Sequence, residues 1–403
     1  RTLTTTVGPV DAVGSSFREF GDQASATIGY LGDFLTPAGI GDLADDVAAG
    51  ADDSETREVV TTTGETVTTE TPDEGRVMSI VGAVQLGANL TENGWLGFLV
   101  FFAAINITIG LFNLLPVLPL DGGHVVIATY ERDGFVLLRA FYDLEQDIHP
   151  IQRAIGRIIA LVRQQNGLRT TPNDDPAGFD AEFGNLIAHD RALGGVVYDA
   201  IKQVPAFVRL VSSKAHETVY QQLRQLDLVG VAGGGYGIRI DNPQEERFRA
   251  GWHQEYPAQL RSVDGAVFWS PLVPIDENTG PVRICVGSHA DGLVPVLGHD
   301  PAHPEKAGAY ALTLADCERR VAQYAQVAPL LVPGDLLVMD FRTIHASGFN
   351  EGRRSRWSMQ SRLFNFNDPT GRRINWSGSY AAGKNFGQIH PELLAESVNV
   401  DRS

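Results

Sequence analysis

The chain has 403 residues, of which 43% are hydrophobic and 20% charged, which is typical of a globular protein with two or three domains. A formal net charge of -17 and a pI of about 5.0 argue against nucleic acid as a partner. The only cysteines are Cys285 and Cys317, so neither a disulfide framework nor a cysteine-rich zinc site is expected.

Residues 1–75 form an acidic first segment. They contain 15 Asp and Glu residues against three Arg, which is most of the excess negative charge of the chain. The stretch "VVTTTGETVTTETPDEG" at 59–75 is typical of a flexible linker, and the helical periodicity before it is weak. We expect this segment to be flexible or loosely helical.

Residues 95–118 form a stretch of 24 residues without a charge, "WLGFLVFFAAINITIGLFNLLPVL". As a helix it would extend about 36 Å, longer than the roughly 30 Å hydrocarbon core of a bilayer. This length favours a transmembrane helix over a buried helix of a soluble protein. We therefore expect a membrane-helix fragment over 76–132, with a membrane as partner through 95–118.

The remaining part, 133–403, has the pattern of a soluble domain. A short strand is predicted at 135–143 and an amphipathic helix at 148–165, with further helices over 183–213 and 215–226. From about residue 227, short apolar runs alternate with Gly, Pro and Asp, which predicts an antiparallel sandwich or barrel and an α+β fold overall.

Three residues of this part could bind a metal ion. His253 and Glu255 stand two apart in "WHQEYP", so on a strand their side chains would share one side. His345 ends another apolar run. Two histidines and a carboxylate are the ligand set of non-haem Fe(II) oxygenases. Arg356 follows eleven residues after His345, and its planar guanidinium suits a dicarboxylate co-substrate.

From about 133 to 396 the sequence resembles the phytanoyl-CoA dioxygenase family of Fe(II)/2-oxoglutarate oxygenases. The resemblance rests on "DGFVLLRAF", "WHQEYP", "ENTGPVRICVGSH" and "LVPGDLLVMDFRTIHASGFNEGRRSRWS", which occur in the family's order. It implies a double-stranded β-helix (jelly roll) with flanking helices, iron held by His253, Glu255 and His345, and the distal carboxylate of 2-oxoglutarate on Arg356 and Ser358. Glu255 departs from the family's usual Asp.

The implied function is a dioxygenase that uses Fe(II), 2-oxoglutarate and O2 to hydroxylate a small organic substrate, releasing succinate and CO2. Its catalytic domain would be cytoplasmic, and membrane-anchored if 95–118 spans a bilayer. A binding module that has lost its chemistry is the alternative, but such a module has no need of an arginine beside a metal site.

The stretch "NLLPVLPLDGGHVV" at 113–126 resembles a core helix of the site-2 protease family of intramembrane zinc metalloproteases. In that family the Asp of "LDG" is a zinc ligand, which implies Asp121 here. The other ligands come from a His-Glu-x-x-His motif that this sequence lacks. Because one Asp cannot hold a catalytic zinc, a protease-like fragment, inactive by itself, is the alternative function.

Overall fold

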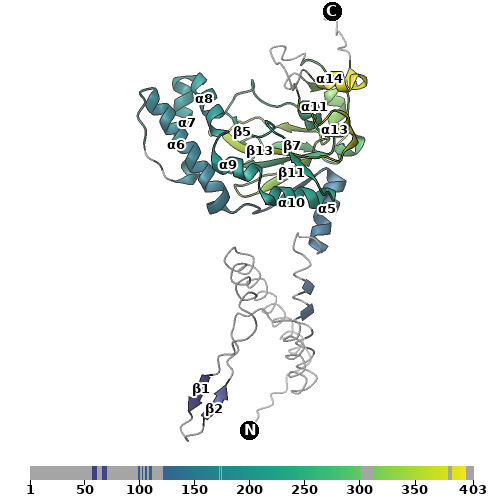
Figure 1. Ribbon diagram of the computed structural model, residues 1–403. Helices are drawn as coiled ribbons and strands as arrows, with labels where there is room; N and C mark the ends of the chain where they lie inside the picture. Colours follow the sequence, from purple (N-terminus) through teal and green to yellow (C-terminus); the bar gives the residue numbers. More distant parts are fainter. Residues whose placement is uncertain are drawn as a thin grey trace, which may run out of the picture. The chain divides into compact units, whose positions relative to one another are not determined.

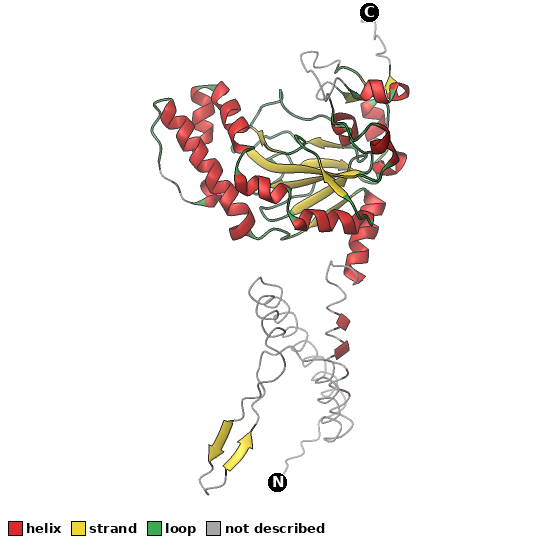
Figure 2. Cartoon of the chain, in the orientation of Figure 1, coloured by secondary structure: helices red, strands yellow, loops and turns green. Residues whose placement is uncertain are grey.

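The computed structural model describes residues 121–171, 173, 175–300, 312–379 and 384–395, two short strands at 57–60 and 66–69, and six positions between 99 and 110. Its contacts divide the chain into two units, residues 1–124 and 125–403. The second unit mixes helices with antiparallel sheets (Figure 1, Figure 2). It therefore has the α+β character predicted from the sequence.

The acidic segment contains a small hairpin. Strand β1 (Arg57–Val60) pairs antiparallel with β2 (Thr66–Thr69). The linker prediction did not anticipate these strands, which are rich in the β-branched Val and Thr that favour extended backbone. The rest of 1–75 lies outside the described residues.

The stretch predicted to cross a membrane, 95–118, also lies mostly outside the described residues. Within the part of the chain that is described, no helix has both the length and the apolar character that a membrane crossing requires.

Helix α5 (Asp121–Asp133) leads into the second unit, and its last turns pack against the sheets. Tyr130 is 1% exposed, and the carbonyl of Glu131 lies 3.0 Å from His289 Nε2. Gly134 then turns the chain with a φ of +81°, and a Cβ there would lie 2.5 Å from side-chain atoms of His289 and Thr343. Glycine is therefore required where the helix meets the first strand.

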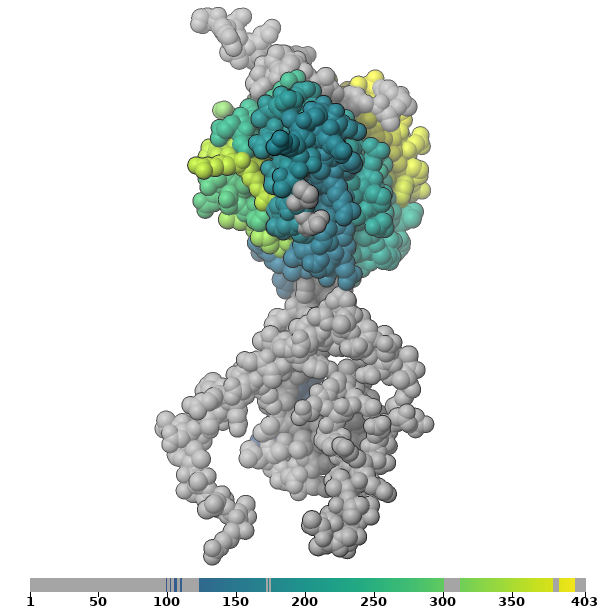
Figure 3. All heavy atoms as spheres, turned by 90° about the vertical axis from the view of Figure 1, so that its left-hand side faces the viewer, coloured from purple at the N-terminus to yellow at the C-terminus, as the bar shows by residue number. Residues whose placement is uncertain are grey.

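A group of helices lies beside the sheets. Helix α6 (His149–Gln165) follows a π-helical turn (Leu144–Ile148) and buries Ile151, Ile155 and Ile159 at helical spacing, as the sequence predicts. The predicted segment 183–213 forms three helices: α7 (Phe183–His189), α8 (Arg191–Ile201) and α9 (Pro205–Val211). Helices α6 to α8 lie together on one side of the sheets, and they dominate the face shown in Figure 3.

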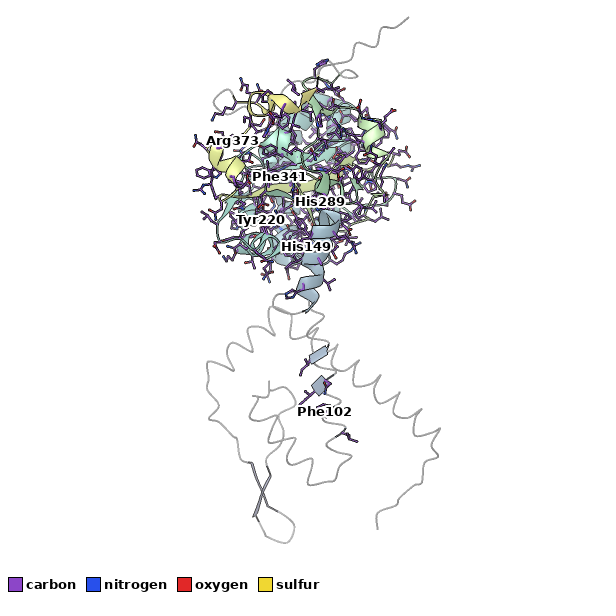
Figure 4. All side chains as sticks on the ribbon, turned by 90° about the vertical axis from the view of Figure 1, so that its right-hand side faces the viewer. Phe102, His149, Tyr220, His289, Phe341 and Arg373 are labelled. Carbon is purple, nitrogen blue, oxygen red and sulfur yellow. The ribbon has the colours of Figure 1, made fainter. Side chains whose placement is uncertain are left out.

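The larger sheet has the order β3-β11-β6-β13-β4, with β5 also paired to β13. Its strands are β3 (Phe135–Leu138), β4 (Val229–Val231), β5 (Gly237–Asp241), β6 (Gly265–Pro271), β11 (Leu336–Asp340) and β13 (Arg356–Asn365). Helix α10 (Lys214–Arg224) packs beside β4. A Cβ at Gly265 would lie 2.3 Å from the ring of Phe341, a buried residue labelled in Figure 4, so β6 can approach that ring only through glycine.

The second sheet has the order β10-β7-β12, from β7 (Val282–Cys285), β10 (Gln326–Val327) and β12 (His345–Ser347). A bridge between His253 and His345 extends this sheet by one position. Along the sequence the chain passes repeatedly from one sheet to the other. This alternation brings residues 253–255 and 345 together although they are distant in sequence.

Candidate metal centre

The two histidines are fixed by their backbones. The amide of His253 donates to the carbonyl of His345, and the amide of His345 donates to the carbonyl of His253, both at 3.0 Å. Glu255 begins the short helix α11 (Glu255–Gln259), and its amide donates to the carbonyl of Phe341 at 2.8 Å. The predicted convergence is therefore found, but a helical turn after His253, rather than a continuous strand, turns Glu255 toward the histidines.

The three side chains present one ligand atom each to a common point. Glu255 Oε2 lies 3.8 Å from His253 Nε2 and 3.7 Å from His345 Nε2. All three ligand atoms lie within 4.8 Å of one another. Nitrogen and oxygen ligands bind divalent transition metals at about 2.0–2.2 Å, so two ligand atoms on one ion lie at most about 4.4 Å apart. The donor set fits such a metal, and the distances of 3.8 and 3.7 Å from Glu255 to the two histidines lie within that limit.

The second ring nitrogen of each histidine already has a hydrogen-bond partner. The Nδ1 atoms of His253 and His345 lie 2.8 Å and 2.9 Å from the carbonyls of Gly251 and Thr343. A carbonyl accepts only from a protonated nitrogen, so each Nδ1 carries the hydrogen and each Nε2 keeps its lone pair for a metal.

Hydrogen bonds also orient the carboxylate of Glu255. Its Oε1 accepts from Arg362 Nε and from Gln259 Nε2, both at 3.0 Å. Oε2 is thereby left facing the histidines. The sequence alone does not predict Arg362 or Gln259 as part of the site. One signal was available for Arg362, because positions 356, 358, 360 and 362 share one face of a strand.

Charge and burial keep Glu255 and His345 in the form that binds a cation. Burial alone raises the pKa of the Glu255 carboxyl, but Arg362 and the two histidines outweigh burial and hold that pKa well below its ordinary value. Burial, and then the neighbouring His253, lower the pKa of His345 to about 4. Near neutral pH, Glu255 is therefore ionised and His345 is neutral.

A cavity of about 800 Å³ contains the three residues. Its walls include Gln360 and Arg362 of β13, Trp269 of β6 and Met339 of β11. This volume lies in the upper part of the roughly 300–1,000 Å³ range of small-molecule sites.

Arg356 and Ser358 lie farther along the same face of β13, and they are not among the cavity-lining residues. Arg356 is 1% exposed; its Nη2 lies 2.7 Å from Asp241 Oδ2, and its Nη1 donates to the carbonyl of Gly280. Ser358 Oγ is buried and has no hydrogen-bond partner among the described residues. The structure thus places a satisfied guanidinium beside an unsatisfied hydroxyl.

Asp121 is the first residue of α5. Its side chain lies outside the described part of the structure. The zinc-ligand role that the protease resemblance implies for it stays a prediction.

Comparison with known proteins divides the chain into two regions. The profile of Peptidase family M50 matches residues 42–140. The zinc metalloprotease Rip1 of Mycolicibacterium smegmatis is 34% identical over 127 residues, which are 31% of this chain and 25% of that protein. Rip1 of Mycobacterium tuberculosis is 43% identical over 56 residues, or 14% of each chain. The chain thus spans a quarter or less of the length of these relatives.

Among solved structures, the non-haem alpha-ketoglutarate-dependent epimerase SnoN of nogalamycin biosynthesis is similar, with 16% identity and a TM-score of 0.40 over 70% of this chain and 97% of that one. AviO1 from Streptomyces viridochromogenes Tue57 has 17% identity and a TM-score of 0.38 over 61% and 96% of the two chains.

The second region is the longer one. The profile of phytanoyl-CoA dioxygenase (PhyH) matches residues 130–358, more than half of the chain, and this range contains the metal centre. The chain therefore belongs to the phytanoyl-CoA dioxygenase family, whose cofactor is Fe(II) and whose co-substrate is 2-oxoglutarate.

Proposed function

We propose that the chain is an Fe(II)- and 2-oxoglutarate-dependent dioxygenase that hydroxylates a small organic substrate and releases succinate and CO2. The observation that carries this proposal is the convergence of His253 Nε2, His345 Nε2 and Glu255 Oε2 at one wall of a large cavity. The two alternating sheets are interpreted as the double-stranded β-helix of this family, with these three residues as the iron ligands.

The bound iron would supply the oxidising chemistry, and the protein residues would orient the reactants. Gly251 and Thr343 keep the two imidazoles in the metal-binding tautomer. Arg362 and Gln259 occupy one oxygen of Glu255 and favour binding through the other. Three protein ligands on one side leave coordination positions for a co-substrate and dioxygen.

We propose that Arg356 and Ser358 bind the distal carboxylate of 2-oxoglutarate. A carboxylate would satisfy the buried Ser358 hydroxyl and accept from the Arg356 guanidinium. It would have to share or replace Asp241, whose pKa is raised by burial but lowered on balance by Arg239 and Arg356. Asp241 is therefore ionised and competes with the co-substrate.

Residues 42–140 give a second candidate, a zinc protease segment that would be membrane-embedded. Asp121 would contribute one of its zinc ligands, and the sequence has no His-Glu-x-x-His motif to contribute the others. We propose that this segment anchors a cytoplasmic oxygenase domain and is not the source of the chain's chemistry. Zinc bound at Asp121 and peptide cleavage by the purified chain would contradict this view.

The test of the main proposal measures metal binding and turnover separately. Anaerobic titration with Fe(II) should show one site, and the His253→Ala variant should lose it. Aerobic incubation with 2-oxoglutarate should yield succinate with the unsubstituted chain only. The exposed His189 of α7 provides a control, because His189→Ala should bind iron normally. Unchanged iron affinity in His253→Ala would show that the ligand assignment is wrong.

A further inference from the structure

The cavity has more space than the co-substrate needs. 2-Oxoglutarate has only about ten non-hydrogen atoms, whereas cavities of this volume hold ligands of drug size. The residues that line the rest of the cavity therefore indicate the chemistry of a second, larger ligand. That molecule would be the substrate of the same site, and its chemistry is inferred on the basis of the proposed oxygenase function.

Aromatic side chains line much of the cavity. Phe248 is 53% exposed, Trp269 is 3% exposed, and the guanidinium of Arg283 lies 4.9 Å from the centre of a Trp252 ring. The aromatic residues that line the cavity include Tyr198, Tyr236, Phe248, Trp252 and Trp269. Large exposed rings at a cavity mouth offer flat apolar surface, on which the rings of a ligand stack or pack edge to face.

Glycines form another part of the wall. Gly195 lies inside helix α8, where glycine is unfavourable, and a Cβ there would meet nothing within 4 Å. Its neighbour Gly194 differs, because a Cβ at that position would lie 2.8 Å from Arg191 and 3.0 Å from Ile187. Packing thus explains Gly194 but not Gly195. Gly234 and Gly251 also line the cavity with open space at the Cβ position. At Gly195 and Gly251 the wall is flat where a side chain would fit, whereas Gly234 has a φ of +74° that by itself favours glycine.

The charge of the lining is opposite to that of the chain. Five arginines line the cavity against two carboxylates, Glu255 and Asp300, whereas the whole chain has a net charge of -17. Four of these arginines form ion pairs: Arg191 with Glu245, Arg239 with Asp241, Arg249 with Glu246, and Arg362 with Glu255.

The fifth arginine, Arg247, has no carboxylate partner among the described residues. Its guanidinium lies 5.2 Å from the centre of the Phe248 ring, and that of Arg191 lies 5.6 Å from the same ring. An exposed guanidinium beside an exposed ring is suited to an anion attached to an aromatic system, because one ligand can satisfy both.

We propose that the substrate is a planar aromatic molecule, larger than 2-oxoglutarate, that carries a negatively charged group. Its ring system packs between the glycine wall at Gly195 and the aromatic side chains. Its anionic group pairs with Arg247 at the mouth of the cavity. A flexible acyl chain would also bury apolar surface on these walls, but it would lose more conformational entropy on binding, so a rigid ring system should bind more tightly.

The test uses the full chain, loaded with Fe(II) and 2-oxoglutarate without oxygen. Three probes are titrated: anthraquinone-2-carboxylate, the neutral anthraquinone-2-carboxamide, and hexadecanoyl-CoA. Binding is followed by quenching of tryptophan fluorescence, because Trp252 and Trp269 line the cavity. The carboxylate should bind at least tenfold more tightly than the carboxamide, and more tightly than hexadecanoyl-CoA.

Two pairs of variants identify the contacts. Gly195→Leu should weaken both anthraquinones at least tenfold, whereas Gly184→Leu, at an exposed helical glycine outside the cavity lining, should not. Arg247→Gln should abolish the preference for the carboxylate, and Arg209→Gln, at an exposed arginine of α9, should preserve it. Leucine is a better helix former than glycine, so melting temperatures should show that Gly195→Leu remains folded.

The outcomes separate the two proposals. If hexadecanoyl-CoA binds more tightly than the anthraquinones, or if Gly195→Leu binds them normally, the substrate proposal is wrong even if succinate is formed. If the unsubstituted chain neither binds Fe(II) nor converts 2-oxoglutarate, the oxygenase proposal fails whatever the probes do.

Discussion

Replacement of Arg356 by Gln should weaken the binding of 2-oxoglutarate by about ten- to 150-fold. Arg356 is 1% exposed, and the variant removes a buried cation that could hold the distal carboxylate. A hydrogen bond to a charged group contributes about 1.5–3 kcal/mol, and each 1.4 kcal/mol is a tenfold change in affinity. Iron affinity should stay unchanged, because His253, Glu255 and His345 do not contact Arg356.

Asp241→Asn should have the opposite effect on the affinity for 2-oxoglutarate. Asp241 accepts from Arg356 Nη2 at 2.7 Å and from Nε at 3.2 Å, so it competes with the co-substrate for the guanidinium. Neutralising it should tighten 2-oxoglutarate binding, although it lowers stability by removing the carboxylate that Arg239 and Arg356 share.

Calorimetric titration of 2-oxoglutarate into the Fe(II)-loaded chain without oxygen measures both effects. Arg354→Gln provides a control two residues away, because Arg354 pairs with Asp180 at 2.6 Å and does not line the cavity. If Arg356→Gln binds 2-oxoglutarate like the control, the role given to Arg356 is refuted, and a cavity-lining arginine such as Arg362 becomes the candidate.

Three further changes test other parts of the structure. Glu255→Asp should weaken metal binding about ten- to 100-fold in an anaerobic titration. The side chain would be one methylene shorter, and the Glu255 carboxylate already lies 3.7–3.8 Å from the Nε2 atoms of the two histidines. Gly265→Ala should lower stability by about 1–3 kcal/mol in urea unfolding, because its Cβ would collide with Phe341. Burial lowers the pKa of His216 to about 4. As the pH falls below about 6.5, this histidine is therefore protonated in the unfolded chain while it stays neutral in the folded chain. This histidine should therefore cost about 2 kcal/mol of stability between pH 7 and pH 5, and His216→Gln, unlike the exposed control His189→Gln, should reduce that loss.

The sequence predicts regular elements well where side-chain periodicity is strong. The isoleucines of α6 are an example, since every third or fourth position is buried. Strand ends are predicted poorly. The expected strand at 135–143 ends at Leu138, and Ala140 takes a φ of +48° while its amide donates to Asp335. That contact joins residues 195 positions apart, so no local pattern reveals it.

The candidate site shows the same limit. The two histidines and the carboxylate carry a recognisable spacing, and so does Arg356. Arg362 lies 107 positions from Glu255, and its contact with that carboxylate depends on the pairing of strands. The pairing of Arg356 with Asp241 also follows from the register of β13 with β5. Both contacts decide the electrostatics of the site, and neither is visible before the sheet is assembled.

The way α5 ends has a practical consequence for isolating the oxygenase region. Tyr130, in the last turn of α5, is buried, and the carbonyl of Glu131 lies 3.0 Å from His289 Nε2. Expression from residue 133, where the sequence suggests a boundary, would remove that phenol ring and open a void the size of a side chain. A fragment that starts at residue 125, where the contacts divide the chain, keeps the Tyr130 side chain buried. A fragment meant to keep the stability of the second unit should therefore include helix α5 from residue 125 onward.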